Sequence, residues 1–372
     1  MSETPFSDLT VAVVGVGLMG GSLGLAARSH AGVRRVVGCS RSEQTLRTAL
    51  ERGAITAACG SLEEACAQAD LVFVATPVRL VREHVAAALA AAPAHAVITD
   101  MGSTKASLMA GLTDVQQRRV IGGHPLCGSE AAGVVNATGS LYEGATYFLT
   151  PGAHVDPGSL ELLYGFVNQI GARPVAVDPE EHDRLMALVS HLPHVLANAL
   201  MTQAGEHAGA RDALLSAGPS FRDLTRIAGA NPRVWTDIFM ENREALLRAL
   251  DAYRRSLDEM RTALSDADEE RIGGLIARAR GHRSRMLAAS DLPADQLYRL
   301  TVRIADRPGV LRALFVALGD AGINVEDMEM HHLSAELGGS LTVYVLGEQA
   351  LAGAAVVLTS LGYEPVIGSV SA

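Results

Sequence analysis

The sequence contains little lysine, few aromatic residues and few cysteines. Lys105 is the one lysine among 31 basic residues, and aromatic residues make up 4% of the chain, with Trp235 as the single tryptophan. The four cysteines show no CxxC spacing, which argues against a disulfide scaffold and fits reduced thiols. The net charge is −10 and no basic stripe is present, so we expect no nucleic-acid partner.

The sequence also lacks a long apolar run and a basic leader. The most nearly continuous apolar stretch, Val85 to Ala94, is interrupted by Pro93 and is shorter than the roughly 20 residues that a helix needs to cross a bilayer. The first ten residues carry acidic side chains and lead directly into an expected strand, so no signal peptide is expected. We therefore expect a cytoplasmic protein without a membrane partner.

What the chain does contain is apolar material for two or three cores, since 48% of its 372 residues are hydrophobic. In the first half, short β-branched runs alternate with helical stretches rich in Ala and Leu. This alternation predicts an α/β domain with a doubly wound parallel sheet of the Rossmann type. The expected strands are Thr10 to Val14, Arg35 to Cys39, Asp70 to Ala75, Ala96 to Asp100, Val120 to Gly123, Tyr147 to Thr150 and Pro174 to Val177.

The strand pattern stops after Asp178. Residues 179–290 carry Leu, Ala and Ile at spacings of three and four, which predicts an all-helical domain. These helices have more apolar positions than one small bundle can bury, so a homodimer is expected. Residues 296–372 follow the order strand, helix, strand, strand, helix, strand, which predicts a ferredoxin-like βαββαβ domain. The expected domains are therefore 8–178, 179–290 and 296–372.

The first strand leads directly into Gly15-Val-Gly17-Leu-Met-Gly20 and then into a helix that begins at Leu18. In this context a GxGxxG pattern binds the pyrophosphate of a dinucleotide, because the glycines allow the turn, the close approach and the helix packing. The helix N-terminus adds partial positive charge. The expected cofactor-binding residues are Gly15, Gly17, Leu18, Met19, Gly20, Ser40, Arg41, Thr76 and Lys105.

The choice between NAD and NADP depends on the end of the second strand. An acidic residue there binds the ribose 2′-hydroxyl of NAD, but this chain has Ser40 and Arg41 instead. A hydroxyl followed by arginine favours the 2′-phosphate of NADP. The same pattern also fits a surface arginine that merely precedes a helix.

Polar residues follow two later strands, at the edge where open α/β sheets bind ligands. Ser103 and Lys105 come after the fourth expected strand, and His124 stands between glycine and proline at the end of the fifth. Ser103 is equally suited to cap the next helix. An imidazole between Gly123 and Pro125 is a poor packing residue, so we expect His124 to act in the site.

The helical domain contributes a second group of candidates. His191 and His194 have a spacing that places them on one face of a helix. No cysteine or carboxylate has a spacing that would complete a zinc site with them, so no metal is expected. Arg226 is a candidate anchor for a carboxylate, or alternatively the partner of Asp223 in an ion pair.

Taken in order, these motifs closely resemble those of the prephenate dehydrogenase family of tyrosine biosynthesis. The motifs are GxGxxG, Asp-x-Gly-Ser-x-Lys, Gly-His-Pro-x-x-Gly-Ser-Glu, Ser-His-Leu-Pro-His, Phe-Arg-Asp-x-Thr-Arg-Ile-Ala and Asn-Pro-x-x-Trp, spread over residues 10 to 290. The later Asp306-Arg-Pro-Gly309 and Gly322-Ile-Asn324 resemble an ACT regulatory domain.

The resemblance implies oxidative decarboxylation of prephenate to 4-hydroxyphenylpyruvate and CO2, with hydride transfer to NAD or NADP. It implies that His124 takes the proton of the ring hydroxyl, that Ser103 orients both groups, and that Arg226 holds a substrate carboxylate. The implied substrate-binding residues are Glu130, His191, His194, Asp223 and Trp235. Glu130 and Asp223 would gate the site or orient the arginine, and Trp235 could come from a partner subunit.

Other functions remain open at this point. Arogenate dehydrogenase and the dehydrogenase of the 4-amino analogue of prephenate use the same chemistry and differ by one side-chain contact. A non-catalytic sensor of nucleotides or amino acids is a rival of another class, although it would not need Ser103, His124 and Arg226 together. For residues 296–372 we expect L-tyrosine as an effector near Asp306, Gly309 and Asn324, with a bare dimerisation module as the alternative.

Overall fold

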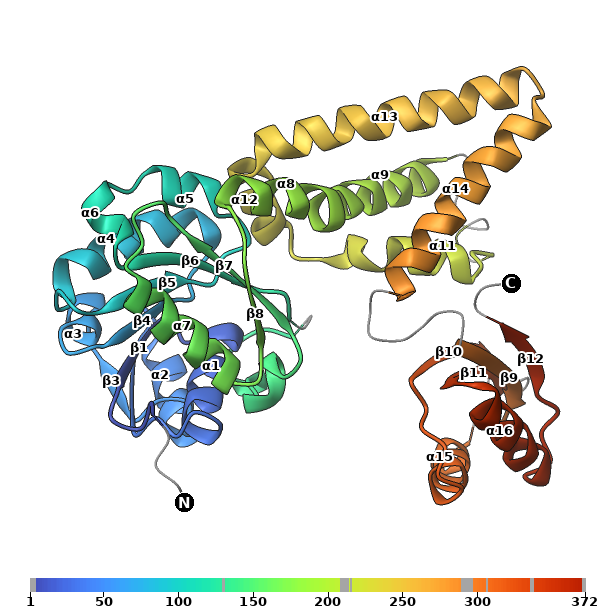
Figure 1. Cartoon of the computed structure of the whole chain (residues 1–372), viewed down its shortest axis with the longest axis horizontal. Coiled ribbons are helices and arrows are strands. Elements are labelled where there is room, and N and C mark those ends of the chain that lie inside the picture. The colour runs from blue at the N-terminus through green and yellow to red at the C-terminus, as the bar shows by residue number, and fades with distance from the viewer. Residues whose placement is uncertain are drawn as a thin grey trace. The chain divides into compact units, whose positions relative to one another are not determined.

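The computed structural model describes residues 5–128, 131–207, 214, 216–288, 297–305, 307–334 and 338–369. The chain divides into two compact units, Met1–Tyr253 and Arg254–Ala372 (Figure 1).

Within the described part of the first unit, eight strands form one sheet in the order β3-β2-β1-β4-β5-β6-β7-β8. The strands are β1 (Thr10–Val14), β2 (Arg35–Cys39), β3 (Ala57–Cys59), β4 (Leu71–Val74), β5 (Val97–Asp100), β6 (Val120–Pro125), β7 (Thr146–Pro151) and β8 (Arg173–Ala176). The first six strands run parallel, as the sequence predicts. The strand order reverses between β1 and β4, which opens a crevice at the carboxyl ends of these strands.

Helices cover both faces of this sheet. Val11 and Val13 of β1 pack in one core with Leu23 of α1 (Leu18–Ser29) and Phe166 of α7 (Pro157–Gln169). Ala12 and Val14 point to the other face and pack in a second core that includes residues of α3 (Leu62–Cys66) and α4 (Val81–Ala91). The other helical elements that cover or flank the sheet are α2 (Glu43–Glu51), η1 (Val78–Leu80), α5 (Ala106–Ala110), α6 (Asp114–Gln117), η2 (Val134–Asn136) and η3 (Gly139–Tyr142).

The prediction of a parallel sheet is wrong for the last two strands. β7 pairs antiparallel with β6, and β8 runs parallel to β7, so both oppose the first six strands. The described part of the β6–β7 connection carries only the short turns η2 and η3, which contact α1. An antiparallel neighbour needs no crossover helix, and this connection supplies none.

The predicted helical region begins with one continuous run, α8 (Pro179–Met186), the π-helical turn η4 (Ala187–His191) and α9 (Leu192–Glu206). Pro193 has no N–H, and its ring would clash with the carbonyl of Val189 in a regular α-helix. The preceding turn is instead widened, and the Leu192 N–H donates to Ala187 O. The unit continues with α11 (Pro219–Thr225), η5 (Arg226–Gly229), α12 (Pro232–Glu241) and the first half of α13 (Arg243–Ser265).

The run Pro179–Glu206 is also long and apolar enough to cross a membrane by length and composition alone. A helix that packs in a core or in a subunit interface passes the same test. The cytoplasmic location expected from the sequence stays a prediction.

The second unit contains the rest of α13, α14 (Glu269–Ala288) and a small four-stranded domain. Its strands are β9 (Leu297–Ile304), β10 (Asp327–Ser334), β11 (Gly338–Leu346) and β12 (Val366–Ser369), in the antiparallel order β10-β11-β9-β12. With α15 (Val310–Asp320) and α16 (Glu348–Ser360) they form the predicted βαββαβ fold around a core of their own (Figure 1).

Candidate active site

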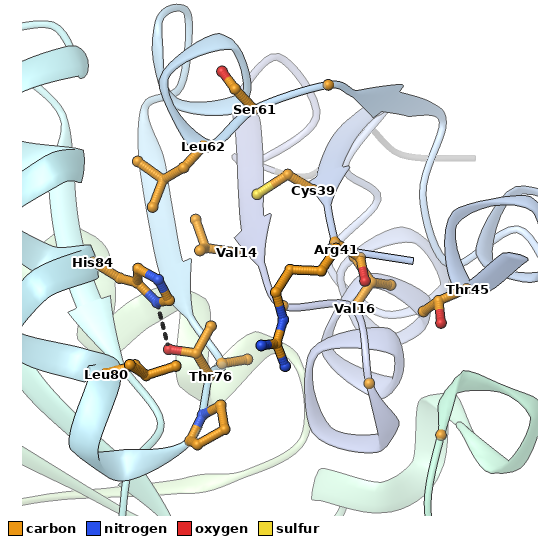
Figure 2. A pocket seen from close by; sticks show the side chains of 17 residues that line it. Val14, Val16, Cys39, Arg41, Thr45, Ser61, Leu62, Thr76, Leu80 and His84 are labelled. Carbon is orange, nitrogen blue, oxygen red and sulfur yellow. Dashed lines mark hydrogen bonds between the residues drawn. The ribbon is translucent and has the colours of Figure 1, made fainter. Parts of the chain in front are cut away.

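A cavity of about 440 Å³ lies at the carboxyl ends of β1, β2 and β4, where the strand order reverses (Figure 2). Gly15 and Gly17 border it from the turn after β1, Ser40 and Arg41 follow β2, and Thr76 follows β4. These are five of the nine residues that the sequence predicts to bind the cofactor. The cavity is also lined by Val14, Val16, Cys39, Thr45, Gly60, Ser61, Leu62, Ala75, Pro77, Leu80, His84 and Gly133.

The three glycines of the motif fit a dinucleotide for different reasons. Gly15 has φ +96°, and a Cβ there would stand 2.6 Å from the Ala75 carbonyl oxygen. Gly17 borders the cavity, and a Cβ built on it would meet no atom within 4 Å, so open space lies where a pyrophosphate approaches the backbone. Gly20 lies outside the cavity lining, and a Cβ there would collide with the Gly15 carbonyl, so it serves the packing of α1 on β1. The turn therefore fits the pyrophosphate of a dinucleotide.

The polar groups of the cavity are a cation and hydroxyls. Arg41 is exposed and immediately precedes Ser42, whose hydroxyl caps α2 by accepting the Thr45 N–H at 3.2 Å. Figure 2 shows the Arg41 side chain extending over the cavity toward Thr76, which in turn is hydrogen-bonded to His84 Nδ1 at 2.9 Å. Among the described residues that line this cavity, none is acidic.

Lys105 does not lie in this cavity, contrary to its predicted role in cofactor binding. Its side chain is completely buried and forms an ion pair with the equally buried Asp100 at the end of β5. Burial lowers the pKa of the Lys105 ammonium, and the Asp100 carboxylate opposes this shift. Gly122 makes room for the lysine, since a Cβ there would stand 2.9 Å from Lys105 Cδ. Lys105 is therefore an internal partner of Asp100.

Asp100 connects this ion pair to the two catalytic candidates. Its carboxylate accepts the Gly102 N–H at 2.8 Å, next to Ser103, and the Gly123 N–H at 3.1 Å, next to His124. One buried carboxylate thus holds the backbone beside both residues. The Asp100 contacts place the carboxyl ends of β5 and β6 side by side. The sequence predicts this arrangement, because it assigns the residues after both strands to one ligand-binding edge of the sheet.

Ser103 is half-buried and does not cap the following helix, which was its alternative role. Helix α5 begins at Ala106 with Lys105 at the cap position. Its first N–H groups instead donate to the Asp183 carboxylate, from Lys105 at 2.7 Å and from Ala106 at 2.9 Å. The Ser103 hydroxyl is therefore not needed as a helix cap.

His124 lies on β6, half-buried, with its Nδ1 2.9 Å from Nε2 of His182. The fully buried His182 packs edge-on against the Phe148 ring, with centroids 5.4 Å apart, and its Nδ1 lies 2.8 Å from Asp183 Oδ1. Burial lowers the pKa of His124 well below 6.5, and nearby His182, Lys105 and His191 lower it further. A lowered pKa favours the neutral imidazole, which is the form in which a base accepts a proton.

A second cavity, of about 760 Å³, lies beside the helical segment. His194, Arg226 and Trp235 line it, together with the segment that follows His124 at Gly128, Ala131 and Ala132. Burial lowers the pKa of His194, and the charge of Arg226 lowers it further. This cavity therefore presents a cation, a neutral imidazole and an indole to a ligand.

The two helical histidines share one face, as predicted, and both contact Trp235. The His194 and Trp235 rings are stacked with centroids 3.3 Å apart, and the His191 ring meets Trp235 edge-on at 6.1 Å. Within the described residues these contacts lie in a single chain, so Trp235 reaches His194 without a partner subunit. His191 is buried, and its Nδ1 accepts a hydrogen bond from Asn242 Nδ2 at 3.1 Å.

The remaining predicted residues are distributed as follows. Glu130 and Asp306 lie outside the described residues. Asp223 is exposed on α11 and is not part of the cavity lining. In the second unit, Gly309 borders a hollow of about 500 Å³, whereas the exposed Asn324 donates to Glu326 at 2.7 Å and does not line that hollow.

Three residues that contact the site were not predicted, namely His182, Asp183 and Asp100. His182 and Asp183 belong to an acidic, polar sequence at the start of a helix, a pattern typical of a solvated face. Their burial is the signal that separates them from such a face, and burial is a property of the folded chain.

Three family models match consecutive parts of the chain. Residues 23–176 match the nucleotide-binding domain of prephenate dehydrogenase, residues 178–278 match its dimerization domain, and residues 298–355 match the ACT domain.

Individual relatives agree with these models. Prephenate dehydrogenase from Bacillus subtilis (strain 168) is 30% identical over 339 residues, which cover 90% of this chain and 91% of the relative. Cyclohexadienyl dehydrogenase from Zymomonas mobilis is 33% identical over 262 residues, which cover 69% of this chain and 89% of the relative. The crystal structure of prephenate dehydrogenase from A. aeolicus with hydroxyphenyl propionate and NAD+ has a TM-score of 0.71 and 30% identity, and covers 76% of this chain and all of that one.

Proposed function

Because this chain belongs to the prephenate dehydrogenase family, we propose that it converts prephenate to 4-hydroxyphenylpyruvate and CO2 at the site around His124. It is an oxidoreductase of tyrosine biosynthesis, and a nicotinamide dinucleotide is its cofactor. The observation that carries the assignment of the site is the position of His124, a neutral imidazole at the carboxyl edge of the sheet beside the segment that carries Ser103.

His124 acts as the general base in this proposal. Ser103 orients the ring hydroxyl and His124 Nε2 takes its proton, while the carbon that bears the oxygen loses its hydrogen as a hydride and becomes a carbonyl. The ring carboxylate leaves as CO2, its bonding electron pair moves through the ring to the carbonyl oxygen, and that oxygen takes a proton back. The ring then becomes aromatic as the phenol of the product, which supplies much of the driving force. A nicotinamide dinucleotide supplies the hydride acceptor for this oxidation when it is bound at Gly15 and Gly17.

Arg226 and His194 hold the substrate in the second cavity. Arg226 is the fixed cation among the described residues that line it, and a guanidinium binds a carboxylate through two parallel hydrogen bonds. His194, held flat against Trp235, lines the side of the cavity for the pyruvyl group. Asp223 lies three residues before Arg226 and orients it.

The absorbance of reduced nicotinamide at 340 nm tests the proposed function. The purified protein is mixed with prephenate or arogenate and with NAD or NADP in each combination. Turnover with prephenate supports the proposal. Turnover with arogenate alone would change the assigned substrate to arogenate, while the assigned reaction, an oxidative decarboxylation, would stay the same. Arogenate is retained as the second candidate because the solved structure of Synechocystis arogenate dehydrogenase is similar to this chain, with a TM-score of 0.67 and 29% identity. No turnover with any pair would favour the non-catalytic sensor.

Of the two nicotinamide dinucleotides, NAD and NADP, this proposal favours NADP as the cofactor. The exposed Arg41 and the hydroxyl of Ser40 line the cavity where an NAD-selective site carries an acid. A 2′-phosphate gains a charge-assisted contact from this arginine, whereas a 2′-hydroxyl does not.

Replacing Arg41 with aspartate is expected to raise the KM for NADP by about 10- to 100-fold, the range of one lost charge-assisted hydrogen bond. The KM for NAD should not rise. Arg47→Asp is the matched control, since Arg47 is exposed on α2, outside the cavity, and the substitution changes the charge equally. Steady-state kinetics with both cofactors decides. An unchanged KM for NADP in Arg41→Asp would show that Arg41 is a surface residue only.

The dimerization-domain match and the exposed apolar side chains of the helical segment support a homodimer. In the first unit these include Leu188, Val189, Met201 and Leu224, each between 38% and 65% exposed in the single chain. Such a set of large apolar side chains is typical of a surface that a second subunit covers.

The small C-terminal domain binds L-tyrosine in this proposal. The hollow of about 500 Å³ lies at the start of α15, where Gly309 has φ +92° and the partial positive charge of the helix N-terminus favours a carboxylate. Arg307 and Tyr363 also line it. β10 is an edge strand of the sheet, so it is able to pair with the same strand of another subunit.

Deleting residues 296–372 is expected to leave the dehydrogenase activity and abolish inhibition by L-tyrosine. The deleted domain has a core of its own, so its removal takes no residue from the two cores of the catalytic unit. Initial rates are measured with and without L-tyrosine for the full-length and the truncated chain. Equal inhibition of both would place L-tyrosine at the active site, and inhibition of neither would leave the domain as a dimerisation module.

A further inference from the structure

The hydrogen bonds of His124 continue into the protein through two residues that the proposed reaction does not use. His124 Nδ1 lies 2.9 Å from His182 Nε2, and His182 Nδ1 lies 2.8 Å from Asp183 Oδ1. His182 is completely buried and Asp183 is 4% exposed, so bulk water does not compete for these contacts. We refer to the three side chains as the His124–His182–Asp183 chain.

The position of each proton in this chain follows from the group at its end. A carboxylate only accepts hydrogen bonds, so His182 donates from Nδ1, which in a singly protonated imidazole leaves the lone pair on Nε2. His124 must then donate from Nδ1. Its own lone pair is on Nε2, which is the nitrogen that the proposed reaction needs as the base.

Asp183 is held in place by more than His182. Its Oδ1 accepts the Lys105 N–H at 2.7 Å and its Oδ2 accepts the Ala106 N–H at 2.9 Å. These two amides end the segment that carries Ser103, and the edge-on Phe148 ring restricts His182 at 5.4 Å. The same carboxylate therefore connects the Ser103 segment to the imidazole of His124.

We propose that His182 and Asp183 are positioning residues, which hold His124 in the tautomer protonated on Nδ1 and keep its Nε2 available as the base. This inference rests on the proposed role of His124 in the reaction. When Nε2 takes the substrate proton, the Nδ1–H of His124 already points to a lone pair, so no rearrangement is needed to stabilise the cation.

The tautomer itself is measured by ¹⁵N NMR of the full-length, unsubstituted protein at neutral pH. The His124→Asn spectrum identifies the His124 signals among the twelve histidines. We expect a protonated Nδ1 and an unprotonated Nε2 on His124. The reverse tautomer would overturn the proposal, and the tautomer is read from the unsubstituted protein, with His124→Asn used for signal assignment only.

Two variants of His182 test the consequence for catalysis. His182→Leu removes the acceptor, and we expect kcat to fall by about 10- to 100-fold with KM for prephenate within about threefold. In the same variant the His124 signals should shift toward protonation on Nε2. His182→Gln retains an N–H for Asp183 and an oxygen for His124, so it should restore most of kcat and the Nδ1–H signal. A residue that only filled space would be replaced equally well by leucine.

The outcomes separate this inference from the proposed function. If His124→Asn keeps full turnover, His124 is not the base, whatever its tautomer. If His124→Asn is inactive but His182→Leu retains both the turnover and the tautomer of the unsubstituted protein, only the positioning role is wrong. Near-UV circular dichroism establishes that each variant is folded, and a His182→Leu variant that unfolds leaves the tautomer measurement and His182→Gln to decide.

Discussion

Replacing His124 with asparagine is expected to lower kcat by about 10²- to 10⁴-fold while the KM for prephenate stays nearly unchanged. The asparagine amide is able to donate to His182 in place of the imidazole Nδ1–H, but it cannot accept a proton from the substrate. Arg226 and His194, the proposed substrate-binding residues, line a cavity on other elements and are not altered. Steady-state kinetics gives both constants, and an unchanged kcat would contradict the assignment of the base.

The pH profile of the unsubstituted protein gives a second test of His124. Burial lowers its pKa well below 6.5, and His182, Lys105 and His191 add to this effect. A base is active when it is deprotonated, so lowering its pKa extends activity to more acidic pH. The acid limb of kcat/KM, which reports the free enzyme, should therefore lie below pH 6.5. A limb at or above pH 6.5 would indicate another titrating group.

Replacing Arg226 with alanine is expected to raise the KM for prephenate by about 30-fold or more. The loss of a hydrogen-bonded partner of a carboxylate costs about 2 kcal/mol at the lower end of the usual range, which corresponds to about 30-fold. The lower end applies because Arg226 is exposed when the cavity holds no ligand. The measurement is KM for prephenate together with direct binding of a product analogue.

Arg222→Ala is the matched control for this prediction. Arg222 is exposed on α11, one turn before Arg226, and is not part of the cavity lining. Arg222→Ala removes the same charge from the same surface but removes no residue of the cavity lining. It should therefore leave the KM for prephenate unchanged. Arg226→Lys should recover only part of the affinity, because an ammonium does not form two parallel hydrogen bonds with a carboxylate. Equal KM values for Arg222→Ala and Arg226→Ala would assign Arg226 a structural role only.

Features that depend on neighbouring residues were predicted well. The strands β1 and β2 begin and end at the predicted residues, and Gly15 and Gly17 of the glycine motif border the cavity. The βαββαβ order of the C-terminal domain was also predicted, since each element has its own apolar period and turn. The short β3 was missed because three residues are too few to show a period.

Features that depend on pairing partners were predicted less well. The local sequence of β7 is that of any buried strand, so its antiparallel pairing with β6 could not be inferred from it. Lys105 was assigned to the cofactor because the one lysine of the chain follows β5, at the edge where open α/β sheets bind ligands. The lysine is instead the partner of a buried carboxylate, in a slot that Gly122 leaves open.

The sequence by itself determined the dinucleotide turn, the order of α/β, helical and ferredoxin-like regions, and the identity of the candidate base. Each of these is a pattern of residue types within a few positions along the chain. Only the tertiary structure brought His124 Nδ1 against His182, 58 residues away, with Asp183 behind it, and these are the contacts from which the tautomer of His124 is inferred. It likewise decided that Asp183, and not Ser103, caps α5 across 78 residues. A hydrogen bond between distant residues exists only after folding has brought them together and removed the water that would otherwise take their place.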